Sequence, residues 1–323
     1  MKQRTLGASG PKVSLLGLGC NNFGLRMEIE ASRAVIHKAL DLGITFFDTA
    51  DVYGKRGGSE IALGMFLGDR RKDIFLATKF GNPMDDSGTM KGGSRRYIMS
   101  AVEASLQRLK TDWIDLYQMH RPDPATPVEE TLRALDDLVK QGKIRYIGCS
   151  QLGGWQLVER QWMARHHDLT PHTACEAEYS LLARDAEREL IPAMRAYGAG
   201  LLPFYPLASG FLTGKYKRNA PMPEGARLTK GKRYADRFMS EANWNALEEL
   251  ERFGKERGRT LLEVALGWLA AQPVVASIIA GATQAEQVAL NAKSIAWELS
   301  PQEVAEIDRI AGKTKPEVGE LQY

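Results

Sequence analysis

Short apolar segments alternate with amphipathic ones along most of the chain. Eight of the apolar segments have few polar positions, which is typical of β-strands that are buried on both faces. They are LLGLGC (15–20), ITFFD (44–48), IFLATK (74–79), WIDLYQMH (113–120), KIRYIGCS (143–150), TACEAEY (173–179), GLLPFY (200–205) and ASIIAG (276–281). The pattern predicts eight strands in one buried sheet.

Segments with the 3.6-residue spacing of amphipathic helices separate these strands. Residues 31–43, 94–110 and 127–142 are the clearest of them, and several end in a glycine that suits a helix C-cap. Eight alternations of strand and helix favour a (β/α)8 TIM barrel, an α/β fold. An open dinucleotide-binding sheet is excluded, because the nearest candidate for its glycine motif, Gly17-x-Gly19, is followed by Asn22 where a third glycine is needed.

Three further segments exceed the eight repeats. A hairpin pattern lies around residues 2–17, and helical patterns lie near 241–257 and 300–311. We therefore expect a barrel with an N-terminal β-hairpin and two extra helices. No internal repeat or linker divides the chain, so residues 1–323 are expected to form a single domain.

One uncharged segment, residues 264–285, is long enough to span a membrane. Gln272 and Pro273 interrupt it, the part before them has helical spacing, and the part after them is β-branched. The pattern predicts a buried helix followed by a core strand, and no membrane partner.

Composition and charge narrow the class of protein. The chain has 323 residues, 44% hydrophobic and 26% charged, with a net charge of +3, which is globular composition without a basic stripe for nucleic acid. The N-terminus lacks the apolar run of a secretory signal, and the three cysteines form no CxxC pair, so we expect a cytoplasmic protein. Three histidines (His166, His167, His172) lack a second cluster of ligands, so no metal is expected.

Four chemically complementary side chains stand where three consecutive predicted strands end. Asp48, Lys79 and His120 end the second, third and fourth strands, and Tyr53 lies in the loop after Asp48. Barrel active sites form at the carboxyl ends of the strands, and adjacent strands lie about 4.8 Å apart. We expect these four residues to converge on one site.

The four groups suit proton donation to a carbonyl oxygen. A nearby ammonium favours the phenolate of a tyrosine, so Lys79 is expected to lower the pKa of Tyr53. Asp48 would be the counter-ion of Lys79, because an unpaired buried ammonium is costly. A neutral His120 would orient the carbonyl oxygen while a hydride reaches the carbonyl carbon. Taken singly, each residue has a structural explanation; together they favour catalysis.

The sequence resembles the aldo-keto reductase family over nearly its whole length. The matching motifs are FDTADVYG (47–54) with GSE (58–60), TKFG (78–81), EASLQRLKTDWIDLYQMHRPD (103–123), GKIRYIGCS (142–150), EYSLL (178–182), PLASGFLTGKY (206–216) and GATQAEQVALN (281–291). The resemblance implies a catalytic tetrad of Asp48, Tyr53, Lys79 and His120, with Tyr53 as the general acid.

The resemblance also implies that NADPH binds across the barrel mouth. Ser150 and Gln151 match the pair that holds the nicotinamide carboxamide, and Asn21 matches a loop position that faces the cofactor. Where the family has a glutamine on the sixth strand, this chain has Glu176. An ionised carboxylate cannot donate to the carboxamide carbonyl. Either Glu176 is protonated or the carboxamide contacts are rearranged.

Further cofactor positions follow from the same resemblance. Phe204 matches the aromatic residue that stacks on the nicotinamide ring. The phosphates are assigned to Tyr205, Pro206, Leu207, Ser209, Lys215 and Arg227, and the adenosine half to Gly281, Thr283, Gln287 and Asn291. Gln287 stands where many members carry an arginine, which weakens selection for the 2′-phosphate of NADPH. Because related branches of the family that share this glutamine still bind NADPH, the resemblance implies NADPH as the preferred cofactor, with NADH as the alternative.

The resulting hypothesis is an NADPH-dependent reductase of aldehydes or ketones that also oxidises alcohols in reverse. Two alternatives stay open: a Schiff-base enzyme with Lys79 as nucleophile, and an NADPH-binding regulatory subunit that senses redox state with little turnover. The expected partner is a small carbonyl substrate, and the chain is expected to be a monomer or a homo-oligomer. Candidate walls of the substrate pocket are residues 22–26, 82–93 and 206–240 and the tail ending in Tyr323.

Overall fold

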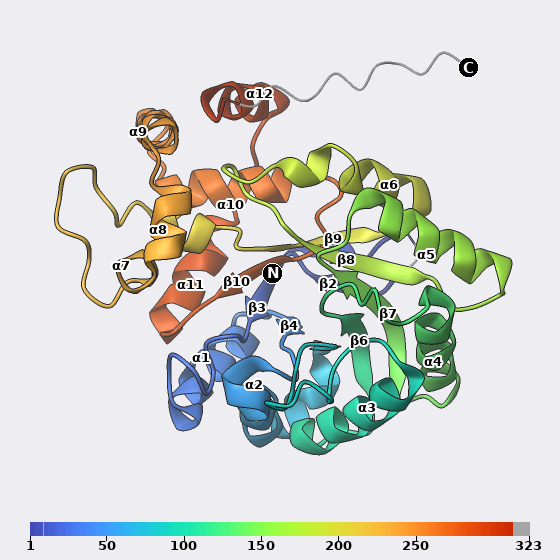
Figure 1. Cartoon of the computed structure of the whole chain (residues 1–323). Coiled ribbons are helices and arrows are strands. Elements are labelled where there is room, and N and C mark those ends of the chain that lie inside the picture. Colours follow the sequence, from blue (N-terminus) through green and yellow to red (C-terminus); the bar gives the residue numbers. More distant parts are fainter. Residues whose placement is uncertain (9, 313–323) are drawn as a thin grey trace, which may run out of the picture.

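The computed structural model describes residues 1–8 and 10–312, and its centre is a barrel of eight parallel strands (Figure 1). The strands are β3 (Leu16–Gly19), β4 (Phe46–Asp48), β5 (Phe75–Phe80), β6 (Ile114–Met119), β7 (Ile144–Ser150), β8 (His172–Glu178), β9 (Gly200–Phe204) and β10 (Ile278–Gly281). Neighbours in sequence pair in parallel, and β10 pairs with β3. The predicted (β/α)8 fold is confirmed.

The barrel closes between β9 and β10 through a short bridge. Leu201 pairs with Val275, just before β10. The amide of Leu201 donates to the carbonyl of Val274 at 2.8 Å, and the amide of Ala276 donates to the carbonyl of Leu201 at 2.9 Å. These two bonds complete the ring of strands.

Helices surround the barrel (Figure 1). They are α1 (Ile29–Asp41), α2 (Tyr53–Phe66), α3 (Arg95–Leu109), α4 (Val128–Lys140), α5 (Gly154–His166), α6 (Leu190–Tyr197), α10 (Leu261–Ala271) and α11 (Ala285–Ser294), with 3-10 turns at Gly68–Asp73, Asp185–Glu187 and Ala208–Thr213. The two predicted extra helices are present as α9 (Glu241–Glu256) and α12 (Pro301–Ile310).

The segment 206–240 differs from the expected long loop, because it contains two short helices. They are α7 (Arg227–Lys230) and α8 (Lys232–Phe238). Leu228 and Phe238 are buried in the main core, and this packing holds the short helices in place.

The uncharged segment near residue 270 forms a core helix and a core strand, as predicted. Thr260 and Glu263 make a reciprocal capping box at the start of α10. The last turn of α10 precedes β10 by a few residues. No helix in the described part of the chain has the length and apolarity that a membrane crossing requires.

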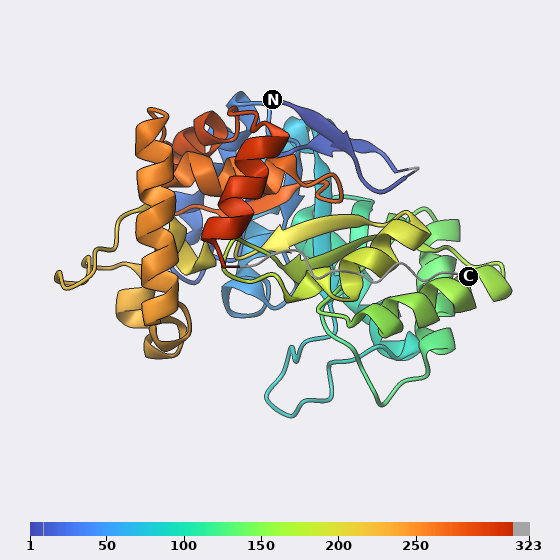
Figure 2. The ribbon, with the colours of Figure 1, turned by 90° about the horizontal axis from the view of Figure 1, so that it is seen from above.

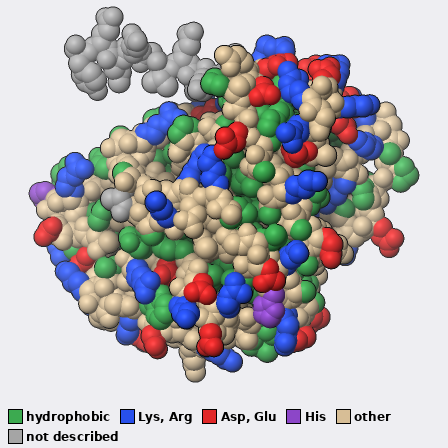
Figure 3. All heavy atoms as spheres, turned by 180° about the vertical axis from the view of Figure 1, so that it is seen from behind, with side chains coloured by type: hydrophobic (Ala, Val, Ile, Leu, Met, Phe, Trp, Pro, Cys, Tyr) green, Lys and Arg blue, Asp and Glu red, His purple; other side chains and the backbone are tan. Residues whose placement is uncertain are grey.

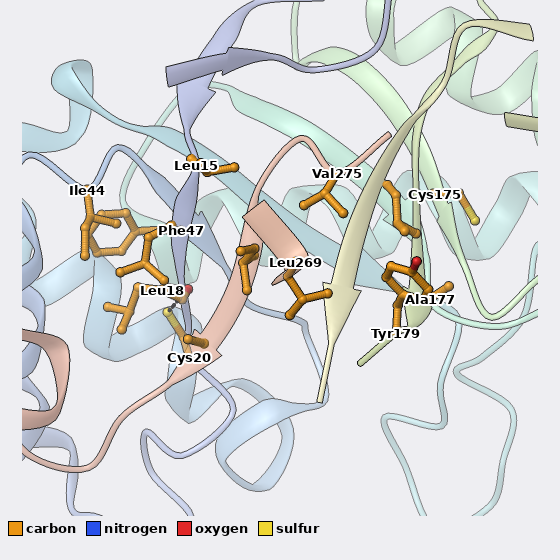
Figure 4. Packing of buried hydrophobic residues seen from close by; sticks show 14 of the residues in the cluster. Leu15, Leu18, Cys20, Ile44, Phe47, Cys175, Ala177, Tyr179, Leu269 and Val275 are labelled. Carbon is orange, nitrogen blue, oxygen red and sulfur yellow. Dashed lines mark hydrogen bonds between the residues drawn. The ribbon is translucent and has the colours of Figure 1, made fainter. Parts of the chain in front are cut away.

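The hydrophobic core has two layers. The larger layer lies between strands and helices, and Figure 4 shows part of it, including Leu18 of β3, Phe47 of β4 and Leu269 of α10. The smaller layer fills the barrel interior and contains Phe46, Phe75, Ala77, Leu116, Ala174, Leu202, Ala276 and Ile279. The period-2 alternation of each strand separates the two layers.

The predicted N-terminal hairpin plugs one end of the barrel. Strands β1 (Gln3–Thr5) and β2 (Lys12–Ser14) pair in antiparallel fashion. Leu6 and Val13 are fully buried and belong to the interior layer. Figure 2 shows the hairpin (dark blue) at one end of the barrel, opposite the loop that follows β5. Because the hairpin covers this end of the barrel, the site must open at the other end, where the carboxyl ends of the strands lie.

Figure 3 shows the molecule from behind, with Lys and Arg side chains interspersed with Asp and Glu.

Candidate active site

At the carboxyl ends of these strands, the side chains that point into the barrel are polar. Phe46 and Ala77 point into the barrel, so two residues further along, Asp48 and Lys79 do the same. The same step leads from Leu116 to Gln118 and from Ala174 to Glu176. Four polar side chains therefore stack directly on the apolar interior.

Lys79 is the centre of this layer. Its side chain is fully buried, and Nζ donates to Oδ1 and Oδ2 of Asp48 at 2.7 and 2.6 Å and to the carbonyl of Thr49 at 2.9 Å. A second carboxyl group faces it, because Oε2 of Glu176 lies 3.1 Å from Nζ. Desolvation opposes the charged form, but the two carboxyl groups raise the pKa of Lys79 above its ordinary value. Lys79 is thus held as an ammonium.

Tyr53 and His120 lie above Lys79. Nζ of Lys79 is 5.1 Å from the centre of the Tyr53 ring, and the rings of Tyr53 and His120 meet edge to face with centroids 5.5 Å apart. Tyr53 begins α2, directly before a left-handed stretch at residues 54–57. At Gly54, which has φ of 69°, a Cβ would meet the carbonyl oxygen of Phe23 at 2.5 Å. That glycine permits the turn which aims Tyr53 at the barrel.

The environment of Tyr53 keeps its hydroxyl protonated. Burial raises the pKa of Tyr53 above its ordinary value. The charge of Lys79 lowers that pKa, while the carboxyl groups of Glu176 and Asp48 raise it again. The net shift is upward, opposite to the lowering expected from Lys79. The main physical reason is burial, which outweighs the effect of the ammonium charge of Lys79.

His120 is a neutral imidazole at ordinary pH, as predicted. Burial, with the nearby positive charges of Lys79 and Arg121, lowers the pKa of His120 to about 3. Its Nδ1 atom is buried and has no hydrogen-bond partner among the described residues. A neutral ring has one N–H donor and one acceptor nitrogen.

Glu176 differs from an ordinary surface acid. Burial and the like charge of Asp48 raise the pKa of Glu176 to about 8, although Lys79 acts in the opposite direction. The sequence left open whether Glu176 is protonated or the carboxamide contacts are rearranged. The raised pKa favours a protonated Glu176.

An open cleft of about 1690 Å³ lies over the polar layer. Lys79 is buried beneath its floor, and the cleft is lined by all the other predicted site residues: Asp48, Tyr53, His120, Asn21, Ser150, Gln151, Glu176, Phe204, Tyr205, Pro206, Leu207, Ser209, Lys215, Arg227, Gly281, Thr283, Gln287 and Asn291. Pockets for single small molecules are of about 300–1,000 Å³. This cleft has room for a larger ligand and a substrate together.

Ser150 and Gln151 lie beside the tetrad at the end of β7. Ser150 pairs in register with Glu176, and the amide of Gln151 donates to the carbonyl of Glu176 at 3.0 Å. The Gln151 side chain donates to the carbonyl of His120 at 3.2 Å. Gln151 is therefore tied to both β6 and β8.

The far side of the cleft carries aromatic and positive groups. The rings of Phe204 and Tyr205 meet edge to face at 5.3 Å, and the guanidinium of Arg227 lies 4.9 Å from the centre of the Tyr205 ring. Desolvation and the nearby Arg26 lower the pKa of the Lys215 ammonium. This group of cations is suited to a phosphate.

At the start of α11, Gln287 is already engaged by the backbone. Its Oε1 accepts from the amide of Thr283 at 2.8 Å. Asn291, one turn further along the helix, is buried. The contact fixes the loop between β10 and α11 along the cleft edge.

Two residues were not singled out in the sequence analysis: Gln118, which is buried and does not line the cleft, and Arg237, which lines it within the expected wall at 206–240. Gln118 donates to Oδ1 of Asp48 at 3.4 Å, and its inward position two residues before His120 was the available signal. Arg237 of α8 donates to Glu178 at 2.8 Å, a pairing that only the folded chain creates. Of the expected wall at 82–93, Asn82 alone lines the cleft. The tail ending in Tyr323 lies outside the described residues.

Among residues 1–8 and 10–312, no group of three or more His, Cys, Asp or Glu side chains is arranged to hold a metal ion. Cys20, Cys149 and Cys175 are free thiols, and all three are buried.

Comparison with known proteins identifies the family of the chain. Residues 15–311 match a family model described as the Aldo/keto reductase family. The chain is 36% identical over 304 residues to a probable voltage-gated potassium channel subunit beta of Arabidopsis thaliana, covering 91% of each chain. It is 34% identical over 321 residues to L-glyceraldehyde 3-phosphate reductase of Escherichia coli K12, covering 96% of this chain and 92% of the other. It is 38% identical over 306 residues to the uncharacterized oxidoreductase YrpG of Bacillus subtilis, covering 91% of each chain.

Proposed function

The chain belongs to the aldo/keto reductase family, and from that membership we propose that it is an NADPH-dependent reductase of aldehydes or ketones. The observation that carries the proposal is the convergence of Tyr53, Lys79 and His120 over a buried Asp48. The reverse reaction, oxidation of an alcohol with NADP+, uses the same groups.

The cleft fits a dinucleotide. Two buried polar atoms on its wall, Oγ of Ser209 and Oδ1 of Asn22, have no hydrogen-bond partner among the described residues. Buried polar groups normally find a partner, so these atoms suit a polar ligand. Ser150 and Gln151 would hold the carboxamide, Phe204 would stack on the ring, and Lys215 and Arg227 would face the phosphates.

In the proposed mechanism Tyr53 is the general acid. The bound cofactor supplies a hydride. As the carbonyl carbon accepts it, the carbonyl oxygen takes the proton of the Tyr53 hydroxyl, and the product is an alcohol. Lys79 stabilises the resulting phenolate through its charge, and Asp48 keeps Lys79 charged and in place. His120 donates a hydrogen bond that orients the carbonyl oxygen.

Replacement of the tyrosine hydroxyl tests this role. Tyr53→Phe should lower kcat for carbonyl reduction by at least about a hundredfold, because the proton donor is lost. The Kd for NADPH should change little, since the ring is kept. NADPH oxidation against a panel of aldehydes and ketones measures the first quantity, and quenching of tryptophan fluorescence measures the second. Unchanged turnover would remove Tyr53 from the acid role.

NADPH is proposed over NADH from the membership of the family, and the additional phosphate of NADPH suits the cations of the cleft. Arg26, Lys215 and Arg227 all line it. The neutral Gln287 weakens the preference for a 2′-phosphate but does not reverse it. Parallel assays with NADH measure the preference directly, as the ratio of kcat/KM for the two cofactors.

The Schiff-base alternative and the regulatory alternative are supported to different degrees. A Schiff-base nucleophile must be a neutral amine, whereas Lys79 is held charged by two carboxyl groups and donates three hydrogen bonds. The regulatory alternative is supported by similarity to probable potassium channel beta subunits. The complete tetrad favours turnover, and tight NADPH binding without reduction of any panel substrate would favour the regulatory function.

A further inference from the structure

Glu176 is a buried acid that the proposed mechanism does not use. Its side chain is 4% exposed and forms part of the cleft floor. A lysine ammonium has three N–H donors, and those of Lys79 go to the two oxygens of Asp48 and to the carbonyl of Thr49. Oε2 of Glu176, 3.1 Å away, therefore accepts no hydrogen bond among the described residues. Its interaction with Lys79 is mainly one of charge.

The charges in this cluster do not balance when both acids are ionised. One ammonium then faces two carboxylates, which leaves a net negative charge in a buried site. Burial and Asp48 raise the pKa of Glu176 to about 8, so at neutral pH the extra proton resides on this side chain. A positive charge that arrives in the cleft favours release of that proton.

The other titratable groups around Glu176 are few. Lys79 faces it from β5, Asp48 from β4 and Tyr53 from α2. On β7 and β8, Cys149 pairs with Cys175, whose thiol has a pKa well above the ordinary value because of Cys149 and burial. On β9 its register partner is the uncharged Leu202. Burial raises the pKa of Asp48 as well, but Asp48 accepts hydrogen bonds from Lys79 and Gln118, whereas Oε2 of Glu176 accepts none among the described residues. These hydrogen bonds favour the ionised form of Asp48, so Glu176 is the acid of the pair that holds a proton more readily.

The backbone places Glu176 beside the residues assigned to the carboxamide. Ser150 is its register partner, and Gln151 donates to its carbonyl. A nicotinamide ring held by these residues is cationic when oxidised and neutral when reduced. We propose that Glu176 discriminates between the two redox forms of the cofactor: its ionised side chain favours the cationic NADP+ ring over the NADPH ring, and its protonated side chain favours neither. This inference rests on the proposed function.

The test is a binding measurement that does not depend on turnover. Isothermal titration calorimetry gives the Kd of NADP+ and of NADPH for the full chain between pH 6 and pH 9. We expect the ratio of the NADP+ Kd to the NADPH Kd to fall about tenfold over this range, as Glu176 loses its proton. Both cofactors carry the same 2′-phosphate, so titration of that phosphate cancels in the ratio.

Two variants make the test specific. Glu176→Gln keeps the size of the side chain and an acceptor facing Lys79, and its ratio should not change with pH. Glu178→Gln removes a carboxylate two residues further along the chain, which also lines the cleft, and should keep the wild-type pH dependence.

Calorimetric titrations near pH 7, repeated in buffers that differ in ionisation enthalpy, give the number of protons that are released when each cofactor binds. NADP+ should release more protons than NADPH from the wild type, and the two should release equally from Glu176→Gln. A wild-type ratio that does not change with pH, or a Glu176→Gln variant that keeps the change, would overturn the inference while leaving the reductase proposal intact. If neither cofactor binds, the proposed function fails and the inference with it.

Discussion

At the scale of single residues, Lys79 connects the fold to the chemistry. It is fully buried, and its charge is matched by Asp48, while the carboxyl group of Glu176 lies 3.1 Å from its ammonium. Removing one member of a buried ion pair leaves an unpaired charge, which costs more than the pair contributes. The same ammonium is positioned to stabilise a Tyr53 phenolate. Stability and catalysis should therefore both depend on Lys79.

Lys79→Met tests this dependence. We expect the free energy of unfolding to fall by about 3–5 kcal/mol and kcat to fall by about a thousandfold. Denaturant titration and NADPH-oxidation assays measure the two effects. The double variant Lys79→Met/Asp48→Asn should recover part of the stability, since the unpaired charge is gone, but none of the activity. A double variant as unstable as the single one would contradict this account.

At the scale of secondary-structure elements, α8 contributes Arg237 to the cleft and contacts β8 through an ion pair, in addition to the core packing of Phe238. Arg237 of α8 donates to Glu178, at the end of β8, at 2.8 Å. Arg237 is half exposed, so the pair is screened by solvent and contributes modestly. The contact nevertheless fixes a short helix beside Lys215 and Arg227.

Arg237→Gln should weaken NADPH binding by about two- to fivefold, in line with the loss of an exposed ion pair. The fluorescence of bound NADPH measures the Kd. Arg257→Gln is a suitable control, because Arg257 pairs with Glu306 of α12 at 3.0 Å and does not line the cleft. Equal effects of the two substitutions would show that α8 has no specific influence on the cleft.

The barrel strands and the two extra helices could be predicted from the sequence, but α7 and α8 could not. The strands are apolar because they are buried on both faces, and that composition is visible along the chain. The two short helices occupy a segment rich in proline and glycine, and their formation depends on Leu228 and Phe238 reaching the core. Such tertiary packing leaves no periodic pattern in so few residues.

At the scale of the whole molecule, a net charge of only +3 hides a local concentration of cations. The cleft lining has more cations than acids: Arg26, Arg121, Lys215, Arg227, Lys230 and Arg237 against Asp48, Glu176, Glu178 and Glu224. The opposite end carries interspersed charges of both signs (Figure 3). An excess of positive charge in a cleft attracts anionic ligands, and salt screens that attraction.

The Kd for NADPH should therefore rise about tenfold between 50 and 500 mM salt, values chosen to span strong and weak screening. The double variant Lys215→Gln/Arg227→Gln should bind more weakly at low salt and depend less on salt. Fluorescence titration at constant pH measures both. Equal salt dependence in the variant and the wild type would place the phosphates away from these two residues.

The sequence by itself determined the eight strands, the order of the elements and the four groups of the tetrad. Strands that are buried on both faces are apolar, and that composition can be recognised in the sequence. In (β/α)8 barrels the carboxyl ends of the strands form one site, so the residues at those ends can be assigned to it. Only the tertiary structure decided the electrostatics. The upward pKa of Tyr53, the satisfied donors of Lys79 and the proton on Glu176 depend on which carboxyl groups face one ammonium across the barrel. Those distances arise between strands that are far apart in sequence, where no local pattern records them.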